Sequence, residues 1–120
     1  MSNNAEASAE MIIAIDFDET YTRDTQMWDK VINTLLLHGN KVICATSRRD
    51  TFENRDDIER ELPIPIVFCS YCPKAEMVRR AGFVVDIWID DNPHSIDPDG
   101  KYTPEETKRR FAEWRDKVEQ

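Results

Sequence analysis

Glycine, cysteine and long apolar runs are all scarce in this chain, and each shortage excludes a class of protein. Only three of the 120 residues are glycine, while 40% are hydrophobic and 33% charged, which indicates an ordered globular protein rather than a fibrous or disordered one. No apolar run approaches the roughly 20 residues of a membrane-spanning helix. The polar, acidic segment 1–10 is unlike a signal peptide, and we expect it to be a disordered tail. We therefore expect a cytoplasmic protein without a membrane partner.

Basic residues are also outnumbered, 16 against 24 acidic ones, which gives a net charge of −8. Nucleic-acid backbones and anionic membranes require clustered Lys and Arg, so long nucleic acid is the less expected partner. A small anionic substrate stays compatible with this charge if basic residues gather locally. The three cysteines, Cys44, Cys69 and Cys72, are an odd number in a chain without secretory features, which argues against a disulfide framework. Cys69 and Cys72 have the spacing of a redox or zinc motif. Zinc needs about four ligands, and the other candidate ligands fall on different elements, which argues against a zinc site.

Short apolar runs alternate with helical patterns along a single domain that we place at 11–120. Strands are predicted at the run before Asp16 and at 41–48, 64–70 and 83–91. An apolar stripe over 27–36 predicts a helix stopped at Gly39, and a brief helix capped by Asn54 and a helix over 73–80 follow. Thr103, Pro104 and Glu106 predict the start of a last helix whose buried face comprises Phe111, Trp114 and Val118. This alternation predicts an α/β fold, a Rossmann-like three-layer sandwich with a mainly parallel sheet.

Polar residues follow each predicted strand, where open α/β sheets bind their ligands. They are Asp16, Asp18 and Thr20, then Thr46 and Ser47, then Ser70 with Lys74, and finally Asp90 and Asp91. Side chains alternate along a strand, so Asp16, Asp18 and Thr20 can share a side. Crowded carboxylates need a cation, and oxygen ligands alone suit a hard ion such as magnesium. The pattern predicts a phosphoryl-transfer site.

Four of these segments together resemble the motifs of the haloacid dehalogenase (HAD) superfamily, most of whose members are magnesium-dependent phosphatases. They are DFDET at 16–20, ATSR at 45–48, Lys74, and IDD at 89–91, and the match covers 12–91. The resemblance implies a phosphomonoester hydrolase in which Asp16 is the nucleophile and Asp18 the acid and base. Thr46 and Lys74 would hold the phosphoryl group. The magnesium ligands would be Asp16, Asp18 through its main-chain carbonyl, Asp90 and Asp91, and the predicted substrate-binding residues are Thr20, Ser47 and Arg48.

Spacing within the resemblance indicates a member without a cap domain. The intervals from Asp18 to Thr46 and from Thr46 to Lys74 each contain 27 residues, enough for one helix, one strand and ordinary loops. An uncovered site suits a small phosphorylated molecule, a protruding phosphate of a larger one, or a homo-oligomer in which a neighbouring subunit covers the site. Glu19 and Ser47 stand where many relatives have glycine, so both neighbours of the site are bulkier and more polar here.

Two alternatives remain open. A receiver-type phospho-accepting domain has similar length, acidity and magnesium use, but it would place its acceptor aspartate after the third strand, where IPIVFCS offers none. A catalytically idle HAD-like module that binds phosphate or a partner would carry the same residues. The substrate stays open among nucleotides, sugar phosphates and nucleic-acid ends.

Overall fold

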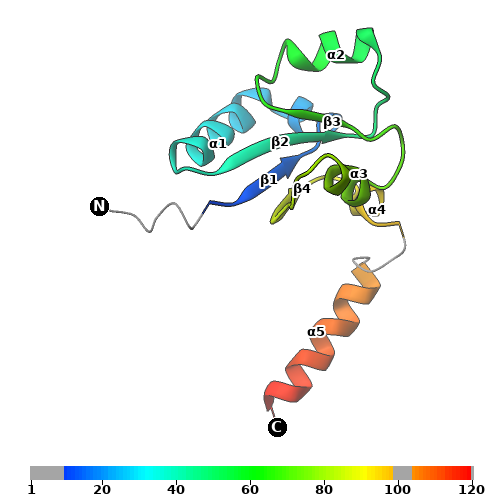
Figure 1. The fold of residues 1–120 in the computed structure, drawn as a ribbon. Coiled ribbons are helices and arrows are strands. Elements are labelled where there is room, and N and C mark those ends of the chain that lie inside the picture. Colours follow the sequence, from blue (N-terminus) through cyan, green and yellow to red (C-terminus); the bar gives the residue numbers. More distant parts are fainter. Residues whose placement is uncertain (1–9, 99–103, 120) are drawn as a thin grey trace.

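The computed structural model describes residues 10–98 and 104–119 and is built around one four-stranded sheet (Figure 1). The strands are β1 (Ile12–Ile15), β2 (Lys41–Thr46), β3 (Ile66–Phe68) and β4 (Ile87–Ile89), in the spatial order β3-β2-β1-β4. All three pairings are parallel. The α/β prediction with a mainly parallel sheet is therefore confirmed, and the architecture is consistent with a Rossmann-like sandwich.

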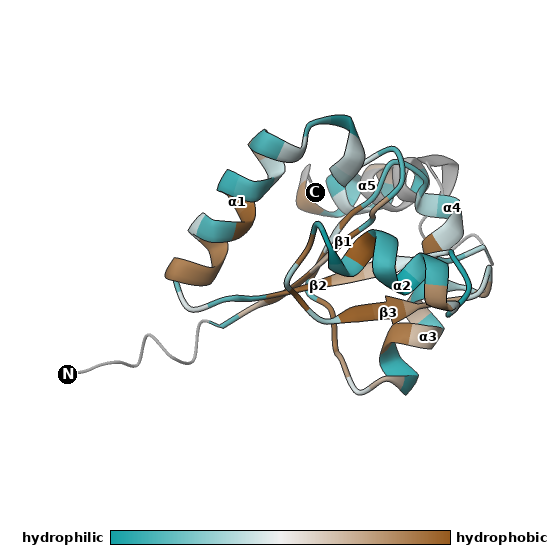
Figure 2. Cartoon of the chain, turned by 90° about the horizontal axis from the view of Figure 1, so that it is seen from above, coloured by the Kyte–Doolittle hydropathy of each residue, from teal (hydrophilic) through white to brown (hydrophobic). Residues whose placement is uncertain are grey.

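Helices cover both faces of this sheet. They are the 3₁₀ helix η2 (Tyr21–Arg23), α1 (Thr25–Leu37), α2 (Phe52–Glu59), α3 (Lys74–Arg80), α4 (Pro93–Ile96) and α5 (Pro104–Glu119). Ile32 of α1 and Ile58 of α2 pack with alternate residues of β1 and β2 in one buried cluster, whereas Val78 of α3 belongs to the cluster on the opposite face. Alternation along the strands thus supplies two cores. Figure 2 shows the strands largely hydrophobic and α2 largely hydrophilic.

Local sequence signals explain most of the helix ends. The Asp24 side chain accepts a hydrogen bond from the backbone N–H of Met27 and caps α1, and Gly39 follows that helix with a φ of 86°. The predicted cap of α2 was wrong, because Thr51 caps this helix by accepting a hydrogen bond from the backbone N–H of Asn54. Asn54 is the third residue of that helix.

Three sequence predictions were wrong: one concerned the length of the edge strands, and two concerned which helix residues are buried. The edge strands β3 and β4 are shorter than 64–70 and 83–91, because each pairs on one side only and the backbone after β3 turns to positive φ. In α1, Met27 and Leu36 are exposed although the stripe predicted an inward face. In α5, Trp114 and Val118 are 57% and 62% exposed, and the helix projects away from the sheet (Figure 1).

Some predictions fall on parts of the chain that are not described. The tail over 1–10, apart from Glu10, the cap at Thr103, the turn at 98–100 beyond Pro98, and the side chain of Phe111 lie outside the described residues. Within 10–98 and 104–119, none of the helices combines the length and apolarity needed to cross a membrane.

Candidate functional site

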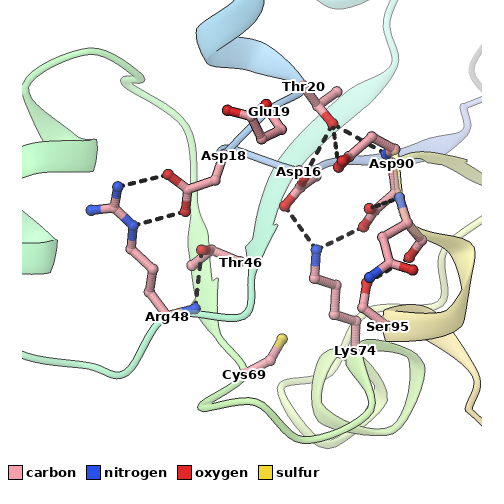
Figure 3. A network of polar contacts seen from close by, with 12 residues as sticks. Asp16, Asp18, Glu19, Thr20, Thr46, Arg48, Cys69, Lys74, Asp90 and Ser95 are labelled. Atoms are coloured by element: carbon pink, nitrogen blue, oxygen red, sulfur yellow. Dashed lines mark hydrogen bonds and ion pairs between the residues drawn. The ribbon is translucent and has the colours of Figure 1, made fainter.

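Three strand ends and the first turn of α3 meet at one edge of the sheet and bring Asp16, Thr46, Lys74 and Asp90 together (Figure 3). Parallel strands end at the same edge, so residues from distant segments converge there. The backbone N–H of Asp16 donates to the carbonyl of Ile89 at 2.9 Å. This bond fixes the end of β1 against the end of β4, one residue before Asp90.

Lys74 is the buried cation of the site. Its side chain is 2% exposed, and its Nζ donates to Asp16 Oδ1 at 2.8 Å and to Asp90 Oδ2 at 2.7 Å. Burial by itself lowers the pKa of Lys74, but the hydrogen bonds and charges of the two aspartates outweigh burial and hold the pKa above its ordinary value. Lys74 is therefore a permanent positive charge in contact with both carboxylates.

A third carboxylate completes an acidic cluster around this lysine. Asp16, Asp90 and Asp91 each offer one oxygen, and these three oxygens lie within 4.8 Å of one another. The Thr20 hydroxyl lies 3.1 Å from both Asp16 Oδ2 and Asp91 Oδ1, and its oxygen accepts a hydrogen bond from the backbone N–H of Asp91. A hydroxyl has one proton, so it satisfies one of the two carboxylates at a time.

Burial and neighbouring groups shift the pKa values of two carboxylates in this cluster. Burial raises the pKa of Asp16 to about 6, against the lowering effect of Lys74. The pKa of Asp91 is lowered, chiefly by a hydrogen bond with Asp16. One ammonium group cannot neutralise three carboxylates, and a set of oxygen donors is the ligand chemistry of a hard divalent cation. Asp16, Asp90 and Asp91 are thus a group of residues that could hold a metal ion.

The Asp18 side chain lies outside this cluster. It is 49% exposed, and its two carboxylate oxygens accept hydrogen bonds from Arg48, from Nε at 2.9 Å and from Nη2 at 2.7 Å (Figure 3). The prediction that Asp16, Asp18 and Thr20 share a side was wrong for Asp18, because β1 ends at Ile15 and strand alternation ends with it. Asp16 and Thr20 do meet.

Arg48 links the loop after β1 to α2. Besides Asp18 it donates to Asp57 Oδ2 at 2.7 Å and to the Asn54 side chain at 3.2 Å, and its guanidinium lies 5.3 Å from the centre of the Phe17 ring. The hydrogen bonds to Asp18 and Asp57 keep the pKa of Arg48 above its ordinary value. Its donors are thus largely engaged within the protein, which gives this predicted substrate-binding residue a structural role as well.

Thr46 and Ser47 occupy the turn after β2. Thr46 is fully buried, and its hydroxyl oxygen accepts a hydrogen bond from the backbone N–H of Arg48 at 3.2 Å, which leaves the hydroxyl proton available to an acceptor in the site. The Ser47 carbonyl accepts from the backbone N–H of Tyr71 at 2.8 Å. Ser47 also lines a hollow of about 430 Å³ beside the site.

Sequence reasoning missed two features of the site. The backbone N–H of Asn92 donates to Asp90 Oδ1 at 2.9 Å and orients that carboxylate. An aspartate followed two residues later by such a donor is a known turn pattern, so this signal was available. Ser70 and Tyr71 adopt φ of 51° and 63°, for which neither residue type gives a sequence signal.

The three cysteines are free thiols. Cys44 and Cys69 are fully buried, and burial raises their pKa to about 12 and about 11. A zinc ligand or a reactive nucleophile must be a thiolate, which these values disfavour. Neither residue therefore competes with the aspartates as the reactive group.

Comparison of the chain with protein-family models, with curated proteins and with solved structures found no match.

Proposed function

We propose that this protein is a magnesium-dependent phosphomonoester hydrolase of the HAD type that works through an aspartyl-phosphate on Asp16. The observation that carries the proposal is the placement of Asp16, whose side chain is 8% exposed, between the buried ammonium of Lys74 and two further carboxylates. A buried carboxylate with a fixed cationic neighbour is a suitable nucleophile for an anionic phosphoryl group, because the cation offsets the repulsion between them.

In the first step, an Asp16 oxygen forms a bond to phosphorus as the bond from phosphorus to the leaving oxygen breaks. Lys74 neutralises charge on the nucleophile, and the buried Thr46 hydroxyl donates to a phosphoryl oxygen. A magnesium ion held by Asp16, Asp90 and Asp91 would supply charge neutralisation of the phosphoryl oxygens.

Asp18 carries the proton in both steps. It gives a proton to the leaving oxygen, then takes one from the water that attacks phosphorus and releases Asp16. Its half-exposed side chain suits an exchange of protons with water, but the ion pair with Arg48 engages both of its oxygens. Arg48 must release at least one of these oxygens during turnover.

The same ion pair favours a second candidate function, a phosphate-binding module without turnover. If Arg48 holds Asp18 throughout, the site keeps its nucleophile and its cations but has no proton carrier. Binding and hydrolysis are therefore measured separately in the experiment that follows.

Hydrolysis of an aryl phosphate tests the proposal with Asp16→Asn, Asp18→Asn and, as a matched control, Asp116→Asn on the exposed surface of α5. Asp16→Asn and chelation of divalent ions should each reduce turnover by on the order of a thousandfold or more, while Asp116→Asn keeps it. Acid quenching with labelled substrate should trap a phosphoryl group on the protein. In Asp18→Asn this label should accumulate, because an aryl leaving group needs little protonation whereas the attacking water needs a base.

Each alternative predicts its own result. Turnover that survives Asp16→Asn excludes the covalent route. Phosphate binding without turnover of any phosphomonoester indicates the binding module. Label that comes only from small phospho-donors and persists on a residue other than Asp16 indicates a receiver-type domain.

A further inference from the structure

A hollow of about 430 Å³ is lined by residues that adjoin the proposed phosphoryl site in the sequence. Three of its lining residues are chain neighbours of site residues: Ser47 follows Thr46, Pro73 precedes Lys74, and Asn92 follows Asp91. A group attached to a phosphate on Asp16 therefore has an immediate place to lie. This volume is within the range of about 300–1,000 Å³ of small-molecule sites.

The lining of this hollow, as far as the structure describes it, is mostly polar and contains no acidic residue, lysine or arginine. Ser47, Asn92, Ser95 and Tyr71 contribute polar uncharged groups and His94 an imidazole, and no aspartate, glutamate, lysine or arginine is among the lining residues that the structure describes. In a chain of which 33% is charged, such a lining favours an uncharged occupant with hydrogen-bonding groups. A second phosphate or a carboxylate on the substrate would find no lysine or arginine among the described lining residues.

Tyr71 is held at the rim of the hollow by a strained but well-bonded turn. Tyr71 is 73% exposed, and both Tyr71 and Ser70 adopt positive φ, a conformation that residues other than glycine rarely adopt. The backbone N–H groups of Ser70 and Tyr71 donate to the carbonyls of Arg48 and Ser47 at 3.1 and 2.8 Å. The backbone of Tyr71 is thus fixed relative to the loop after Thr46, and its exposed aromatic side chain offers a surface on which a planar group can stack.

Two other hollows at this edge are less suited to the substrate. One of about 360 Å³ is lined by four acidic residues and one basic residue, so acidic side chains outnumber basic ones there; they are Glu19, Asp24, Asp90, Asp91 and Arg23. Another of about 480 Å³ has a single residue of the site, Asp90, among the lining residues that the structure describes.

We infer that the hollow lined by Tyr71 binds the leaving group of the substrate, and that Tyr71 is a specificity-determining residue that selects an uncharged alcohol carrying a planar ring, either an aryl group or a nucleoside. This inference rests on the proposed function for the position of the phosphate. It narrows the substrate class to monoesters with a single anionic group.

Binding to the Asp16→Asn protein in the presence of magnesium tests this inference without any need for turnover. The probes are inorganic phosphate, glycerol phosphate, phenyl phosphate, adenosine monophosphate and adenosine, measured by calorimetry. Both ring-bearing phosphates should bind more tightly than inorganic phosphate and glycerol phosphate. The tighter of the two tells whether the ring is an aryl group or a nucleobase.

When Tyr71→Ala is added to Asp16→Asn, the affinity for the ring-bearing phosphates should fall roughly tenfold and the affinity for inorganic phosphate should stay unchanged. The reason is that stacking on an aromatic side chain is worth about 1–3 kcal/mol per base. Tyr71→Phe should keep most of the affinity. Phe52→Ala is the matched control, since Phe52 is an aromatic residue of α2 that is 83% exposed and does not line the hollow.

Two outcomes overturn the inference: ring-bearing phosphates that bind no better than glycerol phosphate, or a Tyr71→Ala effect that is equal for ring-bearing ligands and inorganic phosphate. Failure of the proposed function looks different. If the wild-type protein hydrolyses none of these esters but Tyr71→Ala still weakens the binding of adenosine, the ring-binding role of Tyr71 is confirmed and the proposed hydrolase function is wrong.

Discussion

Replacement of Lys74 by methionine tests the central feature of the site, a single buried ammonium between two carboxylates. Methionine is close to lysine in length and apolar, so Lys74→Met removes the charge with little change in packing. It leaves Asp16 and Asp90, whose side chains are 8% and 3% exposed, facing each other without a cation. Two unpaired buried carboxylates repel and are poorly solvated.

The expected loss of stability can be worked out in two ways. Lys74 makes two hydrogen bonds to charged acceptors, at 2.8 and 2.7 Å, and such bonds contribute about 1.5–3 kcal/mol each, or about 3–6 kcal/mol together. Removal of one partner from a buried ion pair costs about 3–5 kcal/mol. Both estimates of the lost stability are a large share of the roughly 5–15 kcal/mol that stabilises a typical domain.

Urea denaturation of the metal-free protein measures this loss. Lys30→Met, at an exposed lysine of α1, is the matched control and should change the free energy of unfolding by less than about 0.5 kcal/mol. A triple variant, Lys74→Met with Asp16→Asn and Asp90→Asn, should recover part of the loss because it contains no unpaired charge. If the free energy of unfolding of Lys74→Met lies within about 1 kcal/mol of the wild-type value, the interpretation of Lys74 as a buried cation between Asp16 and Asp90 is refuted.

The loss should also depend on pH in a defined direction. Burial already places the pKa of Asp16 at about 6, above its ordinary value, and removal of Lys74 raises that pKa further. The folded variant therefore binds more protons than the unfolded chain over the pH range in which aspartate normally ionises. Its stability should fall relative to wild type as the pH rises from about 5 to about 8, and a constant difference would contradict this reasoning.

Three further predictions concern the same edge of the sheet. Magnesium binding to the metal-free protein, followed by calorimetry, should weaken as the pH falls below about 6, because the ion must displace the proton that the raised pKa of Asp16 retains; unchanged affinity at about pH 5 would contradict this. Thr20→Val should lower the free energy of unfolding by about 1–3 kcal/mol in urea, since the Asp91 N–H loses its acceptor. Arg48→Gln should cost about 1 kcal/mol in low salt and less in concentrated salt, because Asp18 is half exposed; a loss that salt does not change would point to packing rather than charge.

Much of the fold was predictable because the signals are local. The apolar runs before Asp16 and Thr46 mark β1 and β2, the proline before Lys74 marks the start of α3, and the alternation of strands with helices requires a parallel sheet. The edge strands were less predictable, because a strand with one neighbour ends where its pairing ends. The amphipathic pattern of α5 likewise says which face is apolar, but not whether another element covers it, and Trp114 is exposed.

The sequence by itself determined which reactive residues follow the strands, since strand ends and turn residues are encoded within a few positions of the chain. Only the tertiary structure decided how their charges pair. Lys74 reaches Asp16 across 58 positions of sequence and Arg48 reaches Asp18 across 30. The two aspartates of one short motif, DFDET, thus acquire different partners, one buried and one half exposed. The reason is physical: the strength and choice of an ion pair depend on distance and burial, which are properties of the folded chain.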